Sequence, residues 1–463
     1  MASAGKGRRI LVVVQNLPVP FDRRVWLEAT TLAGAGYQVS VICPKAKGYD
    51  ASFEVLEGVH IYRYGLPVDA EGPLGFVGEF AWCFARTAMK TLRVSVLGRG
   101  FDVLQVCNPP ETYWPLAYFW RLFGKRFLFD HHDLSPEMYR AKFPEGSRLV
   151  EAGLRFLERR TFRAADLVIT TNGSHQRIAV ERGGVPPDEV YVVRSGPDVG
   201  RFTLYPPDPA WRKGKRHLLV YLGEICKQDG VDHLVRAVQL LRDELGRDNF
   251  HCVLVGGGPH QPSIKAYAQE IGVAQLCTFT GRVSDDQLCR ILSSADVGVD
   301  PDPKNEWSDK STMNKIMEYM YFGLPVVAYD LTETRLSAGP AADYAEANHE
   351  HDLARRIAGL LDDPKRRTQM GSVGRQRLHE QLAWVHSAPV LLAAYERLLA
   401  VRKPAATAGA SHAGVRAAEY RRGELTAADR SHLLQLPALR GRDAPERVPV
   451  QRRVGRGSPY TGV

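Results

Sequence analysis

A polar segment between two apolar runs carries the side chains best suited to hold a nucleotide. Residues 300–330 predict the end of a strand, a loop, a helix and a second strand. We expect Ser311 to cap the helix, because its hydroxyl can accept hydrogen bonds from the free amides of the first turn. Asn314, Lys315 and Glu318 share one face of this helix at three- and four-residue spacing. The opposite face is apolar and consists of Met313, Ile316, Met317, Met320 and Tyr321.

Two properties of this helix suggest a phosphorylated ligand. Its N-terminus offers unpaired amides and a positive partial charge, which suit a phosphate. Glu318 lies further along the polar face, where its carboxylate can accept hydrogen bonds from both hydroxyls of a ribose. The alternative is an ordinary surface helix whose polar face is solvated.

A second polar group stands at the end of a predicted strand and comprises Asp130, His131, His132 and Asp133. These residue types could bind a metal ion. Consecutive residues of a strand point to opposite faces of the sheet, however, so all four cannot converge on one ion. We therefore predict a polar cluster that lines a cleft, and no metal site.

The elements that position these groups alternate between strands and helices in two series. Continuous apolar runs such as residues 9–14 are typical of parallel strands that are buried on both faces. The fold class predicted is α/β, with two doubly wound, Rossmann-like sheets. Ligands of such sheets bind outside the carboxyl ends of the strands. The loop at 15–22 is therefore a candidate site, with Phe21, Arg23 and Arg24 as its prominent side chains; a proline-stiffened turn with solvated arginines is the alternative.

The alternation of strands and helices and the composition also suggest the domain boundaries. We predict a flexible N-terminus at 1–8, a first domain at 9–203, a polar, proline-rich linker at 204–216, a second domain at 217–386, a closing helix at 387–403 and a disordered basic tail at 404–463.

Composition narrows the class of protein. The 463 residues are 44% hydrophobic and carry a net charge of +9. The predicted tail holds ten Arg, no Lys and five acidic residues, so nucleic-acid binding by the folded body is not indicated. None of the seven Cys forms a Cys-x-x-Cys pair, which favours a reduced, cytoplasmic protein without zinc or disulfides. We expect no signal peptide, and no apolar run reaches the roughly 18 residues of a membrane span.

Several segments resemble the GT-B glycosyltransferases of family 4. Asn314-Lys-Ile-Met-Glu-Tyr-Met and Gly323-Leu-Pro-Val-Val resemble the second half of the family's donor-site signature, which is a Glu, seven residues, a second Glu and a short helix ending in Gly-x-Pro-Val-Val. His132-Asp133-Leu134, residues 190–202 and Gly281-Arg-Val283 resemble further family segments in the same order. The resemblance covers about residues 8–400.

The resemblance implies roles for individual residues. Glu318 matches the Glu that binds the nucleotide ribose, whereas Lys310 stands where the family has its first Glu. The catalytic candidates are His132, which would contact the donor sugar, and Asp133, with His131 as the alternative if the match slips by one residue. The donor-binding candidates are Gly223, Lys227, Arg282, Asp309, Lys310, Ser311, Thr312, Asn314, Lys315 and Glu318. The candidates on the acceptor or phosphate side are Phe21, Arg23 and Arg24.

The resemblance also implies an activity. A retaining, metal-independent transferase without a cofactor would move a sugar from a nucleotide sugar held by the second domain to a glycan, lipid-linked or polysaccharide acceptor on the first. The aromatic, basic stretch at 113–126 could touch the inner face of a membrane, although a core helix is the commoner explanation.

Two further positions depart from the family pattern. Glu224 and Asp229 replace the Arg and Lys that usually hold the donor diphosphate, and two anions would repel it. A non-catalytic partner protein with this fold is therefore an alternative, and a nucleotide-sugar 2-epimerase is another. Asp300-Pro-Asp302 matches the metal motif of a different glycosyltransferase fold, which the alternating strands and helices do not favour.

Overall fold

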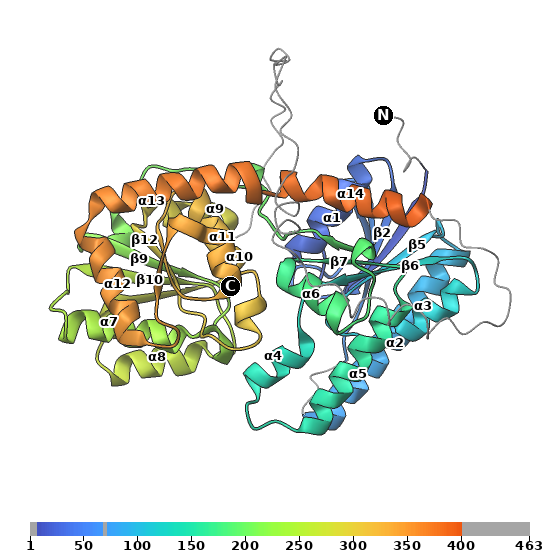
Figure 1. Ribbon diagram of the computed structural model, residues 1–463, viewed down its shortest axis with the longest axis horizontal. Helices are drawn as coiled ribbons and strands as arrows, with labels where there is room; N and C mark the ends of the chain where they lie inside the picture. The colour runs from blue at the N-terminus through green and yellow to red at the C-terminus, as the bar shows by residue number, and fades with distance from the viewer. Residues whose placement is uncertain (1–6, 68–71, 401–463) are drawn as a thin grey trace, which may run out of the picture. The chain divides into compact units, whose positions relative to one another are not determined.

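The computed structural model describes residues 7–67 and 72–400. The predicted disordered tail at 404–463 and most of the predicted flexible N-terminus lie outside these described residues. Within them the chain forms two sheets, each with helices on both faces (Figure 1). This arrangement confirms the predicted α/β fold with two Rossmann-like sheets.

The first sheet has the strand order β3-β4-β2-β1-β5-β6-β7-β8. Its strands are β1 (Arg9–Val13), β2 (Gln38–Pro44), β3 (Phe53–Leu56), β4 (Val59–Tyr64), β5 (Val103–Cys107), β6 (Arg126–His131), β7 (Leu167–Thr170) and β8 (Val190–Val192). Its helices are α1 (Arg23–Gly34), α2 (Gly72–Val96), α3 (Trp114–Arg121), α4 (Ser135–Lys142), α5 (Arg148–Ala164) and α6 (Gly173–Glu181). All strand pairs are parallel except the pairing of β3 with β4. The apolar runs predicted as strands are buried on both faces, as in β1 and β5.

The second sheet has the strand order β11-β10-β9-β12-β13-β14, and all its strands are parallel. Its strands are β9 (His217–Leu222), β10 (Phe250–Val255), β11 (Cys277–Gly281), β12 (Val297–Asp300), β13 (Val326–Tyr329) and β14 (Ala342–Ala345). The helices that follow β9 are α7 (Val231–Asp243), α8 (Gln261–Glu270), α9 (Asp285–Ser294), α10 (Asn314–Tyr321), α11 (Thr332–Ala338), α12 (Glu350–Asp362), α13 (Pro364–Arg377) and α14 (Trp384–Ala400).

The last described helix, α14, returns to the first sheet. Leu391, Ala394 and Tyr395 share a buried core with α1 and with strands β1 and β2. Trp384 at its start donates a hydrogen bond from Nε1 to Thr31 Oγ1 of α1 at 2.8 Å. The chain is therefore tied back to the helix that carries Arg23 and Arg24.

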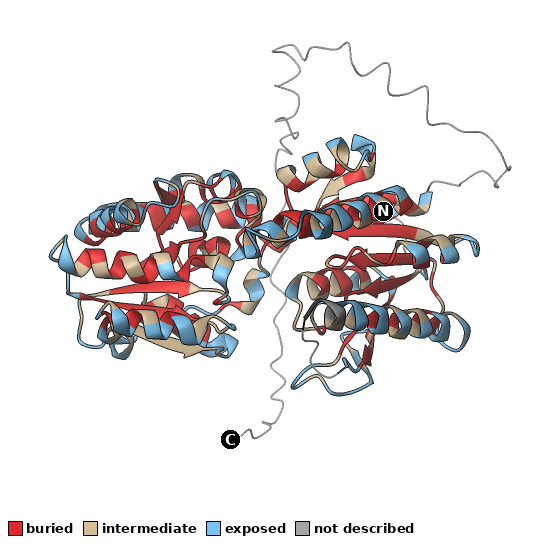
Figure 2. Ribbon diagram, turned by 90° about the horizontal axis from the view of Figure 1, so that it is seen from below, coloured by how far each residue is buried: buried red, intermediate tan, exposed pale blue. Residues whose placement is uncertain are grey.

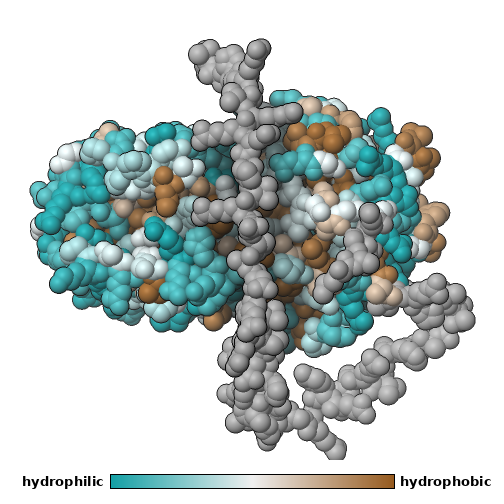
Figure 3. Space-filling view, turned by 90° about the horizontal axis from the view of Figure 1, so that it is seen from above, coloured by the Kyte–Doolittle hydropathy of each residue, from teal (hydrophilic) through white to brown (hydrophobic). Residues whose placement is uncertain are grey.

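Burial follows the layers of the fold. The strands are buried and the outer faces of the helices are exposed (Figure 2). In the view of Figure 3, hydrophobic surface gathers over the part built on β1–β8, whereas the part built on β9–β14 is mostly hydrophilic. Among the described residues, no helix has both the length and the apolar character that crossing a membrane requires.

Candidate functional site

The segment before α10 differs from the sequence prediction at its cap. Residues Ser308–Lys310 form a short 3-10 turn, and the Ser311 hydroxyl donates to the carbonyl of Trp307 at 2.7 Å. The helix starts at Asn314, and the capping position is occupied by Met313 without a side-chain hydrogen bond. The prediction that Ser311 caps the helix is wrong, because its hydroxyl closes the preceding turn instead.

The apolar face of α10 fixes the helix against the second sheet, as its spacing predicts. Ile316, Met317 and Met320 are fully buried. A Cβ at Gly298 of β12 would lie 2.5 Å from the ring of Tyr319, so only glycine lets the helix approach this closely. The Tyr319 hydroxyl accepts from the amide of Leu222 at 2.8 Å. The end of β9 and the polar face of α10 are therefore held in register.

Glu318 lies in a network of ions rather than on a solvated face. Its side chain is 12% exposed. Its Oε1 lies 3.3 Å from Arg23 Nη1 and 3.6 Å from Arg201 Nη2. Asp285 contacts the same two arginines, at 2.9 Å and 3.3 Å. Burial raises the pKa of Glu318 above its ordinary value, while the two guanidinium groups oppose that shift.

A cavity of about 380 Å³ adjoins this network. Its walls come from both sheet units and include Arg23, Arg24, Ser195, Arg201, Asp285, Asn314, Glu318 and Trp384. Four of the residues predicted from the sequence therefore meet at one hollow: Arg23, Arg24, Asn314 and Glu318. Its size suits a small polar ligand.

Lys315, on the same helix, turns away to two buried carboxylates. Its Nζ lies 2.5 Å from Asp302 Oδ2 and 3.2 Å from Asp300 Oδ1. Burial and the neighbouring Asp300 raise the pKa of Asp302 well above its usual range. The ammonium thus occupies the Asp300-Pro-Asp302 pair, and a phosphate would have to compete with these carboxylates for it.

The loop after β9 contains Gly223 and the acidic residues Glu224 and Asp229. Gly223 has a φ of +155°, and a Cβ there would lie 2.9 Å from the Tyr221 hydroxyl oxygen. Asp229 accepts from the amide of Cys226 at 2.9 Å and so closes its own turn. Glu224 and Lys227 are exposed. The loop can therefore approach a ligand closely, but its fixed charge is negative.

Three more predicted donor residues, Lys310, Thr312 and Arg282, contact residues of the first sheet unit, and Phe21 is one of these contacts. Asn172 donates from Nδ2 to the Lys310 carbonyl at 2.9 Å and to Thr312 Oγ1 at 3.0 Å. The Arg282 guanidinium lies 4.0 Å from the centre of the Phe21 ring.

Asp309 has a different role, since it accepts from the amide and hydroxyl of Thr332 at 2.8 and 2.9 Å. It therefore fixes the start of α11.

His132 and Asp133 follow the end of β6. Asn108 Oδ1 accepts from the amides of both residues, at 2.8 Å and 3.1 Å. His132 Nδ1 lies 3.0 Å from Asp130 Oδ2, whereas His131 is directed to Glu158 on the other side of the strand. Burial raises the pKa of Asp133. The side chains of His131 and His132 therefore point to opposite sides of the strand, which is the alternation that argued against a four-ligand metal site.

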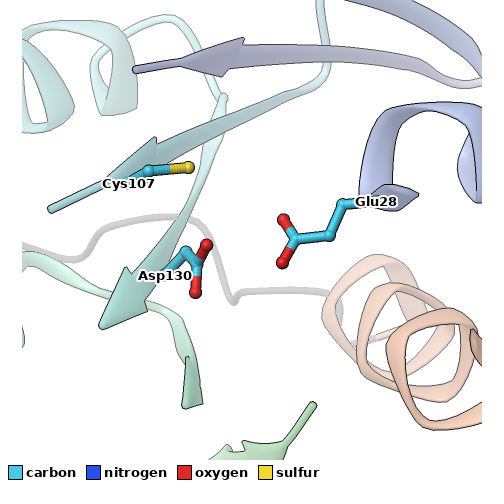
Figure 4. Close-up of side chains that lie close together, drawn as sticks. All are labelled: Glu28, Cys107 and Asp130. Carbon is cyan, nitrogen blue, oxygen red and sulfur yellow. The ribbon is translucent and has the colours of Figure 1, made fainter. Parts of the chain in front are cut away.

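Another group has ligand atoms close enough to suit a metal ion. Glu28, Cys107 and Asp130 lie close together (Figure 4). Arg24 already pairs with both carboxylates. Its Nε lies 3.1 Å from Glu28 Oε1, and its Nη2 lies 2.7 Å from Asp130 Oδ1. Burial also raises the pKa of the Cys107 thiol well above its ordinary value, so the thiol stays protonated. The three residues fit a guanidinium rather than a metal ion.

Two residues of the site were not predicted from the sequence. Arg201 and Asp285 carry no motif, and their roles depend on contacts between parts of the chain that are far apart in sequence. Asp130 belongs to the polar cluster that the sequence predicts, but its pairing with His132 was not predicted, although residues two apart on a strand share one face.

Comparison with known proteins identifies the two halves. A model of "Glycosyl transferase 4-like domain" matches residues 22–196, and a model of "Glycosyl transferases group 1" matches residues 216–363. The 2-deoxystreptamine glucosyltransferase of Streptomyces kanamyceticus is 31% identical over 182 residues, which are 39% of this chain and 45% of that protein. The chain thus matches less than half the length of this relative.

Solved structures share the fold over nearly their whole length. Sucrose-phosphate synthase from Thermosynechococcus elongatus aligns with a TM-score of 0.66 and 19% identity, over 85% of this chain and 99% of that one. Anabaena HepE in complex with UDP and glucose aligns with a TM-score of 0.64 and 15% identity, over 85% and 100%.

Replacing Lys315 by Met tests whether this lysine is committed to the fold. The change leaves the buried carboxylates of Asp300 and Asp302 without their cation, so we expect a loss of about 3–5 kcal/mol in the free energy of unfolding, measured by urea denaturation. The matched control is Lys227→Met at an exposed lysine, which should change stability by less than about 0.5 kcal/mol. Equal stability of the two variants would show that Lys315 is free to serve a ligand.

Proposed function

We propose that this chain, which belongs to the GT-B glycosyltransferases of the family-4-like type, transfers a sugar from a nucleoside-diphosphate sugar to a glycan, lipid-linked or polysaccharide acceptor. The second sheet unit would hold the donor and the first would receive the acceptor. Transfer would retain the anomeric configuration and need no metal ion.

The observation that carries this proposal is the position of Glu318. It is a buried carboxylate on α10, next to a cavity whose walls come from both sheet units. A ribose diol offers two donors to such a carboxylate, and the helix N-terminus at Asn314 offers amides to the adjoining phosphates. The solved structure of Anabaena HepE with UDP and glucose shares this fold, which supports the donor class.

The phosphates need positive charge that the β9 loop does not supply. Glu224 and Asp229 are anionic, and Lys315 is paired with Asp300 and Asp302. Arg23 is half exposed and reaches Glu318 from the first sheet unit. We infer that a bound donor displaces Arg23 from Glu318, and that the released guanidinium then neutralises the phosphates.

Donor binding tests this function directly. We expect one member of a panel of UDP-, GDP-, ADP- and TDP-sugars to raise the unfolding midpoint in the presence of EDTA. At 100 times its dissociation constant the ligand should stabilise the protein by about 2.7 kcal/mol. Glu318→Gln should abolish this shift, because the amide offers one acceptor oxygen where the carboxylate offers two to the ribose hydroxyls.

The matched control is Glu333→Gln, another buried carboxylate of the second unit, which should keep the shift. Stabilisation that needs a divalent ion would contradict the metal-independent mechanism. No stabilisation by any donor at millimolar concentration would instead favour the non-catalytic partner protein that Glu224 and Asp229 suggest.

A membrane-linked acceptor is supported by the exposed apolar side chains of the first unit. Among the described residues, all but three of the exposed large hydrophobic side chains precede residue 200. We define the α5 surface as Leu149 and Phe156 together with the exposed arginines Arg148 and Arg159. Leu149 is 82% exposed and Phe156 is 56% exposed. Apolar and basic side chains on one helix suit the headgroup region of an anionic bilayer, so we propose peripheral contact with the inner face of the membrane.

Sedimentation with vesicles tests the α5 surface. We expect the protein to bind vesicles of mixed phosphatidylglycerol and phosphatidylcholine, and to bind phosphatidylcholine alone more weakly. Leu149→Ser with Phe156→Ser should weaken binding by about tenfold or more, because each buried apolar side chain contributes roughly 1.5–3 kcal/mol. Leu336→Ser, which removes a 53% exposed leucine from α11, is the control. Equal binding of all variants would exclude this surface.

A further inference from the structure

The imidazole of His132 has a fixed partner on its own strand. Asp130 and His132 stand two residues apart, so their side chains leave the same face of the sheet. His132 Nδ1 lies 3.0 Å from Asp130 Oδ2. With Nδ1 engaged in this way, Nε2 is the ring nitrogen left for a bound sugar.

Asp130 is itself held from a second element. Arg24 of α1 donates from Nη2 to Asp130 Oδ1 at 2.7 Å and from Nε to Asp130 Oδ2 at 3.1 Å. Arg24 Nη1 also donates to the Val193 carbonyl at 2.8 Å and to Ser195 Oγ at 2.9 Å. Both oxygens of the Asp130 carboxylate are therefore engaged, and its orientation is determined by buried donors.

The support continues to the last described helix. Glu28 lies beside Arg24 Nε at 3.1 Å and accepts from Gln105 Nε2 at 2.6 Å. The hydroxyl of Tyr395 on α14 donates to Gln105 Oε1. A buried polar chain thus runs from α14 through Gln105, Glu28 and Arg24 to Asp130.

We propose that Asp130 is a positioning residue for the transfer reaction, which holds His132 as an imidazolium with Nε2–H directed to the donor sugar. The proposal rests on the function proposed above for its role in the reaction, but the pairing of Asp130 with His132 is independent of any ligand. Because an imidazolium has no free acceptor, His132 then acts as a hydrogen-bond donor and a positive charge at the sugar, and not as a general base.

The electrostatics of the cluster agree with this geometry. Burial by itself lowers the pKa of His132, but the Asp130 carboxylate outweighs burial and raises that pKa from 6.5 to about 9. The charged and titratable groups that act on the imidazole from the surrounding elements are Asp22, Arg24, Glu28, Asp130, Asp133 and His175.

The pH dependence follows from the direction of this shift. Because the folded-state pKa exceeds the ordinary 6.5, the imidazolium contributes stability in full below pH 6.5. That contribution is lost as the pH rises toward about 9. Sugar transfer should therefore also fall on the alkaline side, when the donor proton leaves His132.

Asp130→Asn provides the test with the nucleotide sugar identified by the stability panel. The neutral amide no longer offsets the effect of burial, which lowers the pKa of His132. The alkaline limb of the kcat profile should therefore move down by roughly two pH units. We expect kcat to fall by about a hundredfold or more, while the stabilisation by the nucleotide stays unchanged. Glu158→Gln is the matched control, because it removes an equally buried carboxylate that faces His131 on the opposite side of β6; it should leave the limb in place.

Histidine-labelled NMR tests the pairing in the wild type without ligand, with the His132 signals identified by their loss in His132→Gln. We expect His132 to titrate near pH 9 with Nδ1 protonated. Titration at or below pH 6.5 in the wild type would overturn the proposal, as would an unchanged pH profile in Asp130→Asn. A wild type that binds no nucleotide sugar but shows the expected His132 titration would contradict the proposed function alone.

Discussion

One buried cation, the guanidinium of Arg24, determines how the first sheet presents its strand ends. Arginine stays charged at every pH at which the protein folds, so burying it requires anionic or hydrogen-bonding partners from several elements. Arg24 finds Glu28 on its own helix, Asp130 at the end of β6, and Val193 and Ser195 after β8. The same group therefore sets the end of β6, from which His132 follows, and anchors the segment that leads toward the second sheet. A metal ion in this cluster would have to displace the cation on which the arrangement depends.

The second sheet unit, which we propose to hold the donor, has an excess of carboxylates. Asp300 and Asp302 pair with the buried Lys315, and Asp229 lies close enough to Lys315 and Glu224 to feel both charges. Here Arg23 of the first sheet unit reaches Glu318 of the second, and its guanidinium is the cation that we propose for the phosphates of the donor.

The sequence was sufficient for elements whose signal is local. The apolar run of β1 and the periodic face of α10 predict a buried strand and an amphipathic helix, and the structure contains both. Local signals failed where partners are distant. Ser311 has the right type for a cap, but the turn that ends at Lys310 takes its hydroxyl. Lys315 shares a helix face with Glu318, yet its partners lie at the end of β12 and on the loop that follows it. The contact between Arg23 and Glu318 joins residues 295 apart in sequence, which no periodicity records.

We propose that Glu318 binds the nucleotide and that His132 acts on the sugar. Calorimetric titration with the nucleoside diphosphate of the identified donor, combined with sugar-transfer rates, tests it in the two variants Glu318→Ala and His132→Ala. The account predicts that Glu318→Ala loses nucleotide binding, whereas His132→Ala binds the nucleotide as the wild type does and loses transfer by about a hundredfold or more. Equal loss of nucleotide binding in both variants, or transfer that persists in His132→Ala, would contradict it.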